Sequence, residues 1–104
     1  MTRTMPRPRH GRAAASITVS QTHAGGWVYA IKYRTNLEGG ALNQAAAAPS
    51  EHEALLAGVA RLESTCDRII RDARGNSGDA QVIQDWLRDL KSETQQPALF
   101  EVAA

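Results

Sequence analysis

The stretch WVYAIKYRT, residues 27–35, decides the fold that we expect for this chain of 104 residues. Large apolar residues alternate along it with small or charged ones, which is the two-residue period of a half-buried β-strand. One face would carry Trp27, Tyr29, Ile31 and Tyr33, and the other Val28, Ala30, Lys32 and Arg34. The stretch therefore predicts a strand whose aromatic face needs cover from a second layer.

Two further strands are expected around this one. SITVSQTH, residues 16–23, alternates in the same way, and the AGG that follows is typical of a hairpin turn. NLEGG, residues 36–40, predicts the next turn, and ALNQAAAA, residues 41–48, is a weaker strand because alanine has poor β propensity. The three segments predict an antiparallel meander.

A long helix is expected after Pro49. Ser50 and Glu53 form a capping box, in which each side chain accepts a hydrogen bond from the other residue's free backbone N–H. An apolar stripe then recurs with helical spacing at Leu55, Val59, Leu62, Cys66, Ile69 and Ala73. Gly58 interrupts the helix and suits a place where helix and sheet approach closely.

A second helix is expected after the turn RGNSG, with Asp79 as its N-cap. Its apolar face would consist of Val82, Ile83, Trp86, Leu87 and Leu90. The predicted fold is therefore α+β, a three-stranded antiparallel meander with both helices packed on one face. This domain spans residues 16–93, between a disordered basic arm, residues 1–15, and a flexible tail, residues 94–104.

The charge is unevenly distributed. Residues 1–37 contain no acidic residue, whereas residues 38–104 hold all 11 acids against 6 basic residues, a balance of −5. The basic residues of the first part are Arg3, Arg7, Arg9, Arg12, Lys32 and Arg34. They are candidates for weak, salt-sensitive contacts with nucleic-acid phosphates. The aromatic face of residues 27–33 would serve either as core or as a platform for stacking bases.

The composition of the chain bears on its compartment, its cofactors and its oligomeric state. Cys66, the only cysteine, falls on the apolar stripe, so we expect a buried thiol in a reducing compartment, the bacterial cytoplasm. We expect no metal and no cofactor, because the histidines and acids lack the spacing of a ligand set. No membrane span is expected. The small, alanine-rich core makes a homodimer a reasonable expectation.

One partial resemblance points to an enzyme. GGWVYAIKY, residues 25–33, together with EHEALLAGVARLE, residues 51–63, resembles ribonuclease H-like proteins. The resemblance implies a β-β-β-α-β-α unit in which RIIRD, residues 68–72, is a strand. Glu51 and Asp72 would then be catalytic carboxylates of a residual metal-dependent nuclease or a degenerate nucleic-acid-binding protein. The sequence departs from that family because no acid precedes Glu38.

A broader resemblance favours a binding protein. The chain is similar to small proteins of bacterial plasmids and integrative elements in residues 26–29, 39–40, 50–54, 86–87 and 96–100. It implies a non-enzymatic accessory or adaptor protein of a mobile element. A small inhibitor of a host complex stays open as a third possibility.

The sequence of the tail predicts a protein partner. Gln96, Leu99 and Phe100 fit the Q-x-x-L-F pattern of ligands of the bacterial sliding clamp, in which the Leu–Phe pair fills an apolar pocket. We expect Pro97 to keep this segment out of the second helix. The alternatives are that Phe100 docks on the open face of the sheet, or that the tail binds nothing.

Overall fold

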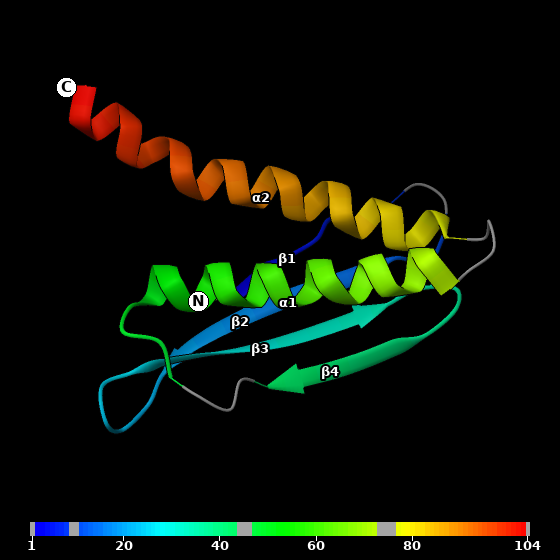
Figure 1. The fold of residues 1–104 in the computed structure, drawn as a ribbon, viewed down its shortest axis with the longest axis horizontal. Helices are drawn as coiled ribbons and strands as arrows, with labels where there is room; N and C mark the ends of the chain where they lie inside the picture. The colour runs from blue at the N-terminus through cyan, green and yellow to red at the C-terminus, as the bar shows by residue number, and fades with distance from the viewer. Residues whose placement is uncertain (1, 9–10, 44–46, 73–76, 104) are drawn as a thin grey trace.

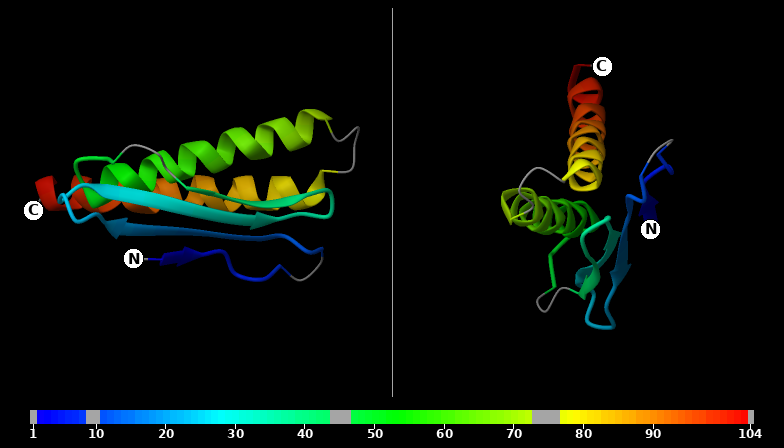
Figure 2. Two further views of the ribbon diagram at one scale, coloured as in Figure 1. Left: turned by 90° about the horizontal axis from the view of Figure 1, so that it is seen from below. Right: turned by 90° about the vertical axis from the view of Figure 1, so that its right-hand side faces the viewer.

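The computed structural model describes residues 2–8, 11–43, 47–72 and 77–103. It is α+β, with one antiparallel sheet in the order β1-β2-β3-β4 and two helices on one of its faces (Figures 1 and 2). The strands are β1 (Thr2–Thr4), β2 (Ala14–Gln21), β3 (Trp27–Arg34) and β4 (Gly39–Asn43). The helices are α1 (Glu51–Asp72) and α2 (Gly78–Ala103).

The sheet has four strands where the sequence predicted three, and the additional strand comes from the segment predicted to be a disordered arm. Arg3 pairs with Ile17 in the register of β1 and β2, and the Met5 N–H donates to the Ala15 carbonyl at 2.9 Å. Met5 and Ala13 are buried in the core. Residues 2–8 and 11–15 therefore belong to the fold, because their few apolar side chains find cover beneath α2.

The aromatic face of β3 is core. Ile31 is fully buried together with Ile17 on β2, and the rings of Trp27, Tyr29 and Tyr33 pack half-buried against the same cluster. Since α1 lies on β2 and β3 from this side, the rings are not available as a stacking platform. We call this helix-covered side of the sheet the covered face.

The first helix confirms most of the sequence pattern. Ser50 is its N-cap, with its hydroxyl accepting from the Glu53 N–H at 3.1 Å. The buried residues include the predicted Leu55, Val59, Leu62, Cys66 and Ile69, whereas Ala73 lies outside the described residues. α1 is helical through Asp72, so the ribonuclease H-like alternative, with a strand over residues 68–72, is wrong. The apolar stripe continues through Ile69 at helical spacing, and burial of that stripe outweighs the β propensity of RIIRD.

The second helix runs antiparallel to α1 beside it (Figure 1). Its buried residues are Ala80, Ile83, Leu87 and Leu90. Val82 is 37% exposed and Trp86 only half-buried, because the buried stripe falls one residue away from them on the helix circumference. Asp79 is not the N-cap, because α2 begins at Gly78 and the Gln81 N–H donates to the carbonyl of Ser77.

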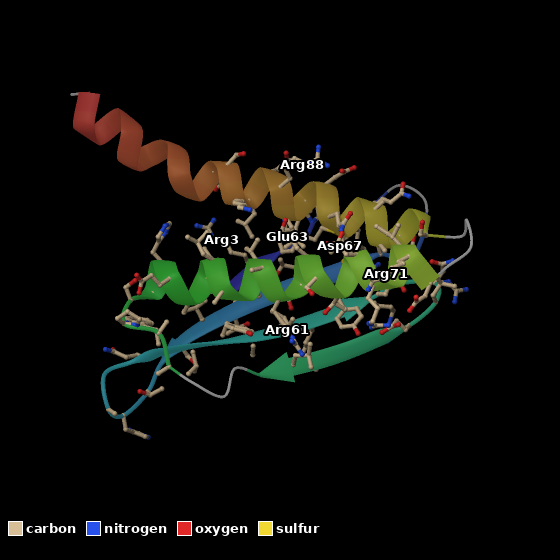
Figure 3. The ribbon with its side chains drawn as sticks, in the orientation of Figure 1. Arg3, Arg61, Glu63, Asp67, Arg71 and Arg88 are labelled. Carbon is tan, nitrogen blue, oxygen red and sulfur yellow. The ribbon has the colours of Figure 1, made fainter. Side chains whose placement is uncertain are left out.

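Polar contacts flank the pairing of the two helices. Glu63 and Asp67 on α1 point toward α2 (Figure 3). Asp67 accepts from the Gln84 amide, and the Lys91 ammonium lies 3.8 Å from the Glu63 carboxylate. Both contacts hold the helices in one register along the seam.

The end of the chain differs from the prediction of a flexible tail outside the second helix. The backbone of α2 is helical through Ala103 and includes Pro97. A proline inside a helix costs about 3 kcal/mol, but its neighbours in QQPALFE include glutamine, alanine and leucine, which are good helix formers. The last turns of α2 project past the start of α1, away from the sheet (Figures 1 and 2).

Candidate functional site

The side of the sheet without helices, which we call the open face, carries two adjacent cations. Lys32 and Arg34 point to this side because they alternate with the buried face of β3, and both are exposed. Their cross-strand neighbours are small: Ala14, Ser16, Gly39 and Ala41. Because these cross-strand neighbours are small, they do not cover the side chains of the two cations.

These small residues form the floor of a hollow of about 890 Å³ that opens to solvent. Four basic side chains line it: Arg7, Arg12, Lys32 and Arg34. They come from the segment after β1, the approach to β2, and β3, so only folding brings them together. Among the described residues, none of the four makes an ion pair with a carboxylate. We call this site the basic hollow.

Of the six predicted nucleic-acid-binding residues, the structure places one, Arg3, away from the basic hollow. Arg3 lies on the helix side of the sheet (Figure 3), where its guanidinium is 3.4 Å from the Glu93 carboxylate of α2. The alternation of β1 puts Arg3 on the same side as Ile17, and the pattern Thr-Arg-Thr-Met was the signal for that placement. Arg9 lies outside the described residues.

Glu38 is the one acidic residue among the described residues that line the hollow, and its carboxylate is already bound. Both oxygens of Glu38 accept from the Arg68 guanidinium, at 2.9 and 2.8 Å, and the Tyr33 hydroxyl donates to it at 2.9 Å. The bonds from Arg68 and then Tyr33 hold the pKa of Glu38 below its ordinary value. Burial, followed by the bond to Glu38, raises the pKa of Tyr33. Because Arg68 offsets the charge of Glu38, the basic hollow keeps an excess of positive charge.

A carboxylate from α2 positions the rim of the basic hollow. Asp79 is buried and accepts from the backbone N–H of Arg12 at 3.2 Å and from that of Asn36 at 2.8 Å. Gly11 has a φ of +86°, and a Cβ there would overlap the Asp79 carboxylate. Asp79 thus joins two segments that line the hollow. No local sequence pattern indicated this contact, because its partners are 67 residues apart in the chain.

The carboxylates expected for a nuclease do not come together. Glu51 and Asp72 are the first and last residues of α1, roughly 31 Å apart at 1.5 Å per residue. Two metal ions in a nuclease lie about 3.5–4 Å apart, so these side chains cannot share them. Among the described residues, no group of three His, Cys, Asp or Glu is placed to hold a metal ion.

The thiol of Cys66 is not poised for chemistry. It is fully buried in α1, and burial, with smaller contributions from Asp67 and Glu63, raises its pKa to about 11. The nucleophilic form of cysteine is the thiolate, which is scarce at neutral pH when the pKa is this high. Cys66 is a core residue, as the apolar stripe predicted.

The predicted clamp-binding residues, Gln96, Leu99 and Phe100, lie on the last turns of α2. The backbone of these turns is on the helix side of the molecule and extends away from it (Figure 2).

Comparison of the chain with models of protein families, with curated proteins and with solved structures found no match. In the part of the chain that the structure describes, no helix has the length and apolar character needed to cross a membrane.

Proposed function

We propose that this protein is a non-enzymatic, nucleic-acid-associated accessory protein whose basic hollow binds backbone phosphates. The observation that carries the proposal is the convergence of Arg7, Arg12, Lys32 and Arg34 on one hollow; Glu38, the one acid among the described residues that line it, is held by Arg68. Phosphate contacts from lysine and arginine supply most of the sequence-independent affinity of proteins for nucleic acid.

The expected affinity is modest. Binding of this kind has dissociation constants of about 10⁻⁴–10⁻⁶ M at physiological salt. If all four cations neutralise a phosphate of double-stranded DNA, log K should fall against log salt with a slope of about −3.6. Such a surface suits a protein that another contact brings to nucleic acid.

Charge reversal tests the proposal. Fluorescence anisotropy with a labelled duplex compares the parent with Lys32→Glu/Arg34→Glu, and we expect a loss of affinity of about tenfold or more. The matched control is Arg61→Glu/Arg71→Glu, the same change of net charge on exposed residues of α1 (Figure 3). Equal losses in both variants would assign the effect to net charge, and no binding by the parent would end the proposal.

The tail supports a second candidate function, attachment to the bacterial sliding clamp. The supporting observations are the pattern of Gln96, Leu99 and Phe100 and the projection of the last turns of α2 from the body (Figure 1). Burying leucine and phenylalanine contributes about 1.5–3 kcal/mol each, enough for roughly micromolar binding once the segment is ordered. Clamp binding would bring the basic hollow to DNA, as expected of an adaptor.

The clamp contact is tested with purified bacterial clamp. Leu99→Ala/Phe100→Ala should abolish binding without changing the melting temperature, while Val102→Ala, outside the pattern, serves as the control. A large fall in the melting temperature, with no clamp binding by the parent, would show that the segment packs within the protein instead.

A further inference from the structure

We infer that the nucleic acid recognised by the basic hollow is double-stranded and is bound through its phosphates without reading its bases. This inference rests on the proposed function, since it names which nucleic acid the site takes. It follows from three features of the open face: the spacing of its cations, the chemistry of their neighbours, and the position of the aromatic rings.

The spacing of the cations suits a continuous backbone. Lys32 and Arg34 lie two residues apart on the same side of β3, which puts their Cα atoms about 6.8 Å apart. That separation is comparable with the distance between successive phosphates along one strand of nucleic acid. Arg7 and Arg12 line the hollow from the β1 side, where they can reach further phosphates. The arrangement matches a line of phosphates better than a single anion.

The neighbours of these cations offer hydrogen bonds to phosphate oxygens. Thr4 and Ser16 line the hollow beside Lys32, and Thr2 and Thr18 continue the same face, with their hydroxyls 3.2 Å apart. Hydroxyl and cationic contacts to phosphate fix the position of a protein on nucleic acid but carry no sequence information. We therefore expect binding to be independent of sequence.

The aromatic rings are on the wrong side to bind unpaired bases. Trp27, Tyr29 and Tyr33 pack beneath α1 on the covered face. Among the described strand residues that point to the open face, the largest apolar side chain is that of Val28. Single strands are usually held by stacking of bases on aromatic side chains, in addition to phosphate contacts. Without stacking, we expect a flexible single strand to bind more weakly than a duplex. The phosphates of a duplex are closely spaced and are held in a fixed arrangement before binding.

An anionic membrane surface would present phosphate as well, but the face is less suited to it. Among the described residues that line the hollow, Leu37, which is 45% exposed, is the one exposed large apolar side chain available for insertion. Stable attachment to a membrane combines buried apolar area with charge. The four cations around a floor of small residues favour the duplex.

The test compares four ligands with the full-length protein at several salt concentrations. They are a labelled DNA duplex, either of its strands alone, a duplex of shuffled sequence, and vesicles containing phosphatidylserine. We expect the duplex to bind at least about threefold tighter than either strand, and the shuffled duplex to bind within about twofold of the first. The salt slope of about −3.6 should fall by about half in Lys32→Ala/Arg34→Ala and stay unchanged in Arg61→Ala/Arg71→Ala.

Tryptophan fluorescence supplies a second readout. Because Trp27 is on the covered face, a bound single strand should leave its emission unchanged, and a Trp86→Phe background isolates this signal. Quenching by the strand, tighter binding of the strand than of the duplex, or a strong sequence preference would overturn the inference while leaving the proposed function intact. Binding to the vesicles but not to any nucleic acid, or to none of the ligands, would overturn both.

Discussion

Ile31 and Lys32 are consecutive residues of β3, yet one is completely buried and the other exposed. The covered face of the sheet carries the core beneath α1, and the open face carries the cations of the basic hollow. This comparison teaches that a small domain can separate stability from binding by the alternation of one strand, since side chains of adjacent residues point to opposite sides.

The two faces also differ in how much room they leave. On the covered face, α1 approaches so closely that a Cβ at Gly58 would lie 3.0 Å from the Ile17 Cγ2 atom and 3.3 Å from the Tyr29 Cβ. On the open face, Gly39 and Ala41 leave space beside the cations. Small residues therefore serve close packing on one side and an accessible hollow on the other.

The largest effect is expected from substitution within β3 itself. Ile31→Ala should lower the free energy of unfolding by about 2–5 kcal/mol, because it leaves a cavity in the covered face. Lys32→Ala, one residue away, should change it by less than about 0.5 kcal/mol. Urea denaturation measures both values. A comparable loss at Lys32 would mean that the open face is buried against something in solution.

The segment that joins the rim of the basic hollow to α2 should be the next most sensitive. Gly11→Ala introduces a side chain at positive φ and displaces the Asp79 carboxylate from the backbone N–H of Arg12 and Asn36. Gly25→Ala is the matched control, because its φ is +92° and nothing lies within 4 Å of its Cβ.

We expect Gly11→Ala to destabilise the protein by about 1–3 kcal/mol more than Gly25→Ala, since it also takes these two donors away from the buried Asp79 carboxylate. Thermal denaturation compares the two variants. Equal losses would show that Asp79 moves aside without cost and does not position the rim.

A smaller effect is expected where α1 touches the covered face. Replacing a glycine inside a helix by alanine ordinarily raises the free energy of unfolding by about 1 kcal/mol. Gly58→Ala should instead lower stability by about 1 kcal/mol, because the buried Ile17 and the Cβ of Tyr29 cannot give way. The control is Ala60→Gly, at an exposed position of the same helix, which should cost about 1 kcal/mol. It measures the difference in helix propensity between alanine and glycine without a packing effect. Urea titrations measure both variants. A Gly58→Ala variant more stable than the parent would contradict the close approach of α1 to the sheet.

The smallest effect is expected at the rim between the faces, where Glu38 meets Arg68 and Tyr33. The folded-state pKa of Glu38 is lowered, so the ion pair stabilises the protein above the unfolded-state pKa of the carboxyl, and this contribution is lost as the pH falls through the folded-state value. Glu38→Gln should cost at most about 1 kcal/mol at neutral pH. Melting temperatures of both proteins should converge as the pH falls through the lowered pKa of Glu38, and a difference that grows on acidification would contradict the assignment.

Patterns within single elements predicted much of this molecule. The alternation of residues 27–34 indicated both faces of β3, and the stripe from Leu55 to Ile69 indicated the buried side of α1. Each of these signals is local, because it depends only on the period of a strand or a helix. β1 was missed because three residues of strand are too few for a period to be evident, although the alternation of Arg3 and Met5 with two threonines was present.

The sequence by itself determined the α+β class, the gathering of the aromatic residues on one face of β3 and the presence of cations on the other, while the tertiary structure decided that the aromatic face is core. Only the tertiary structure decided which cations share a site: it brought Arg7 and Arg12 to Lys32 and Arg34, and turned Arg3 toward Glu93. It also set Asp79 against the segment that carries Arg12. The physical reason is that strand pairing and helix packing join residues far apart in the chain, and the period of a single element contains no information about its partners.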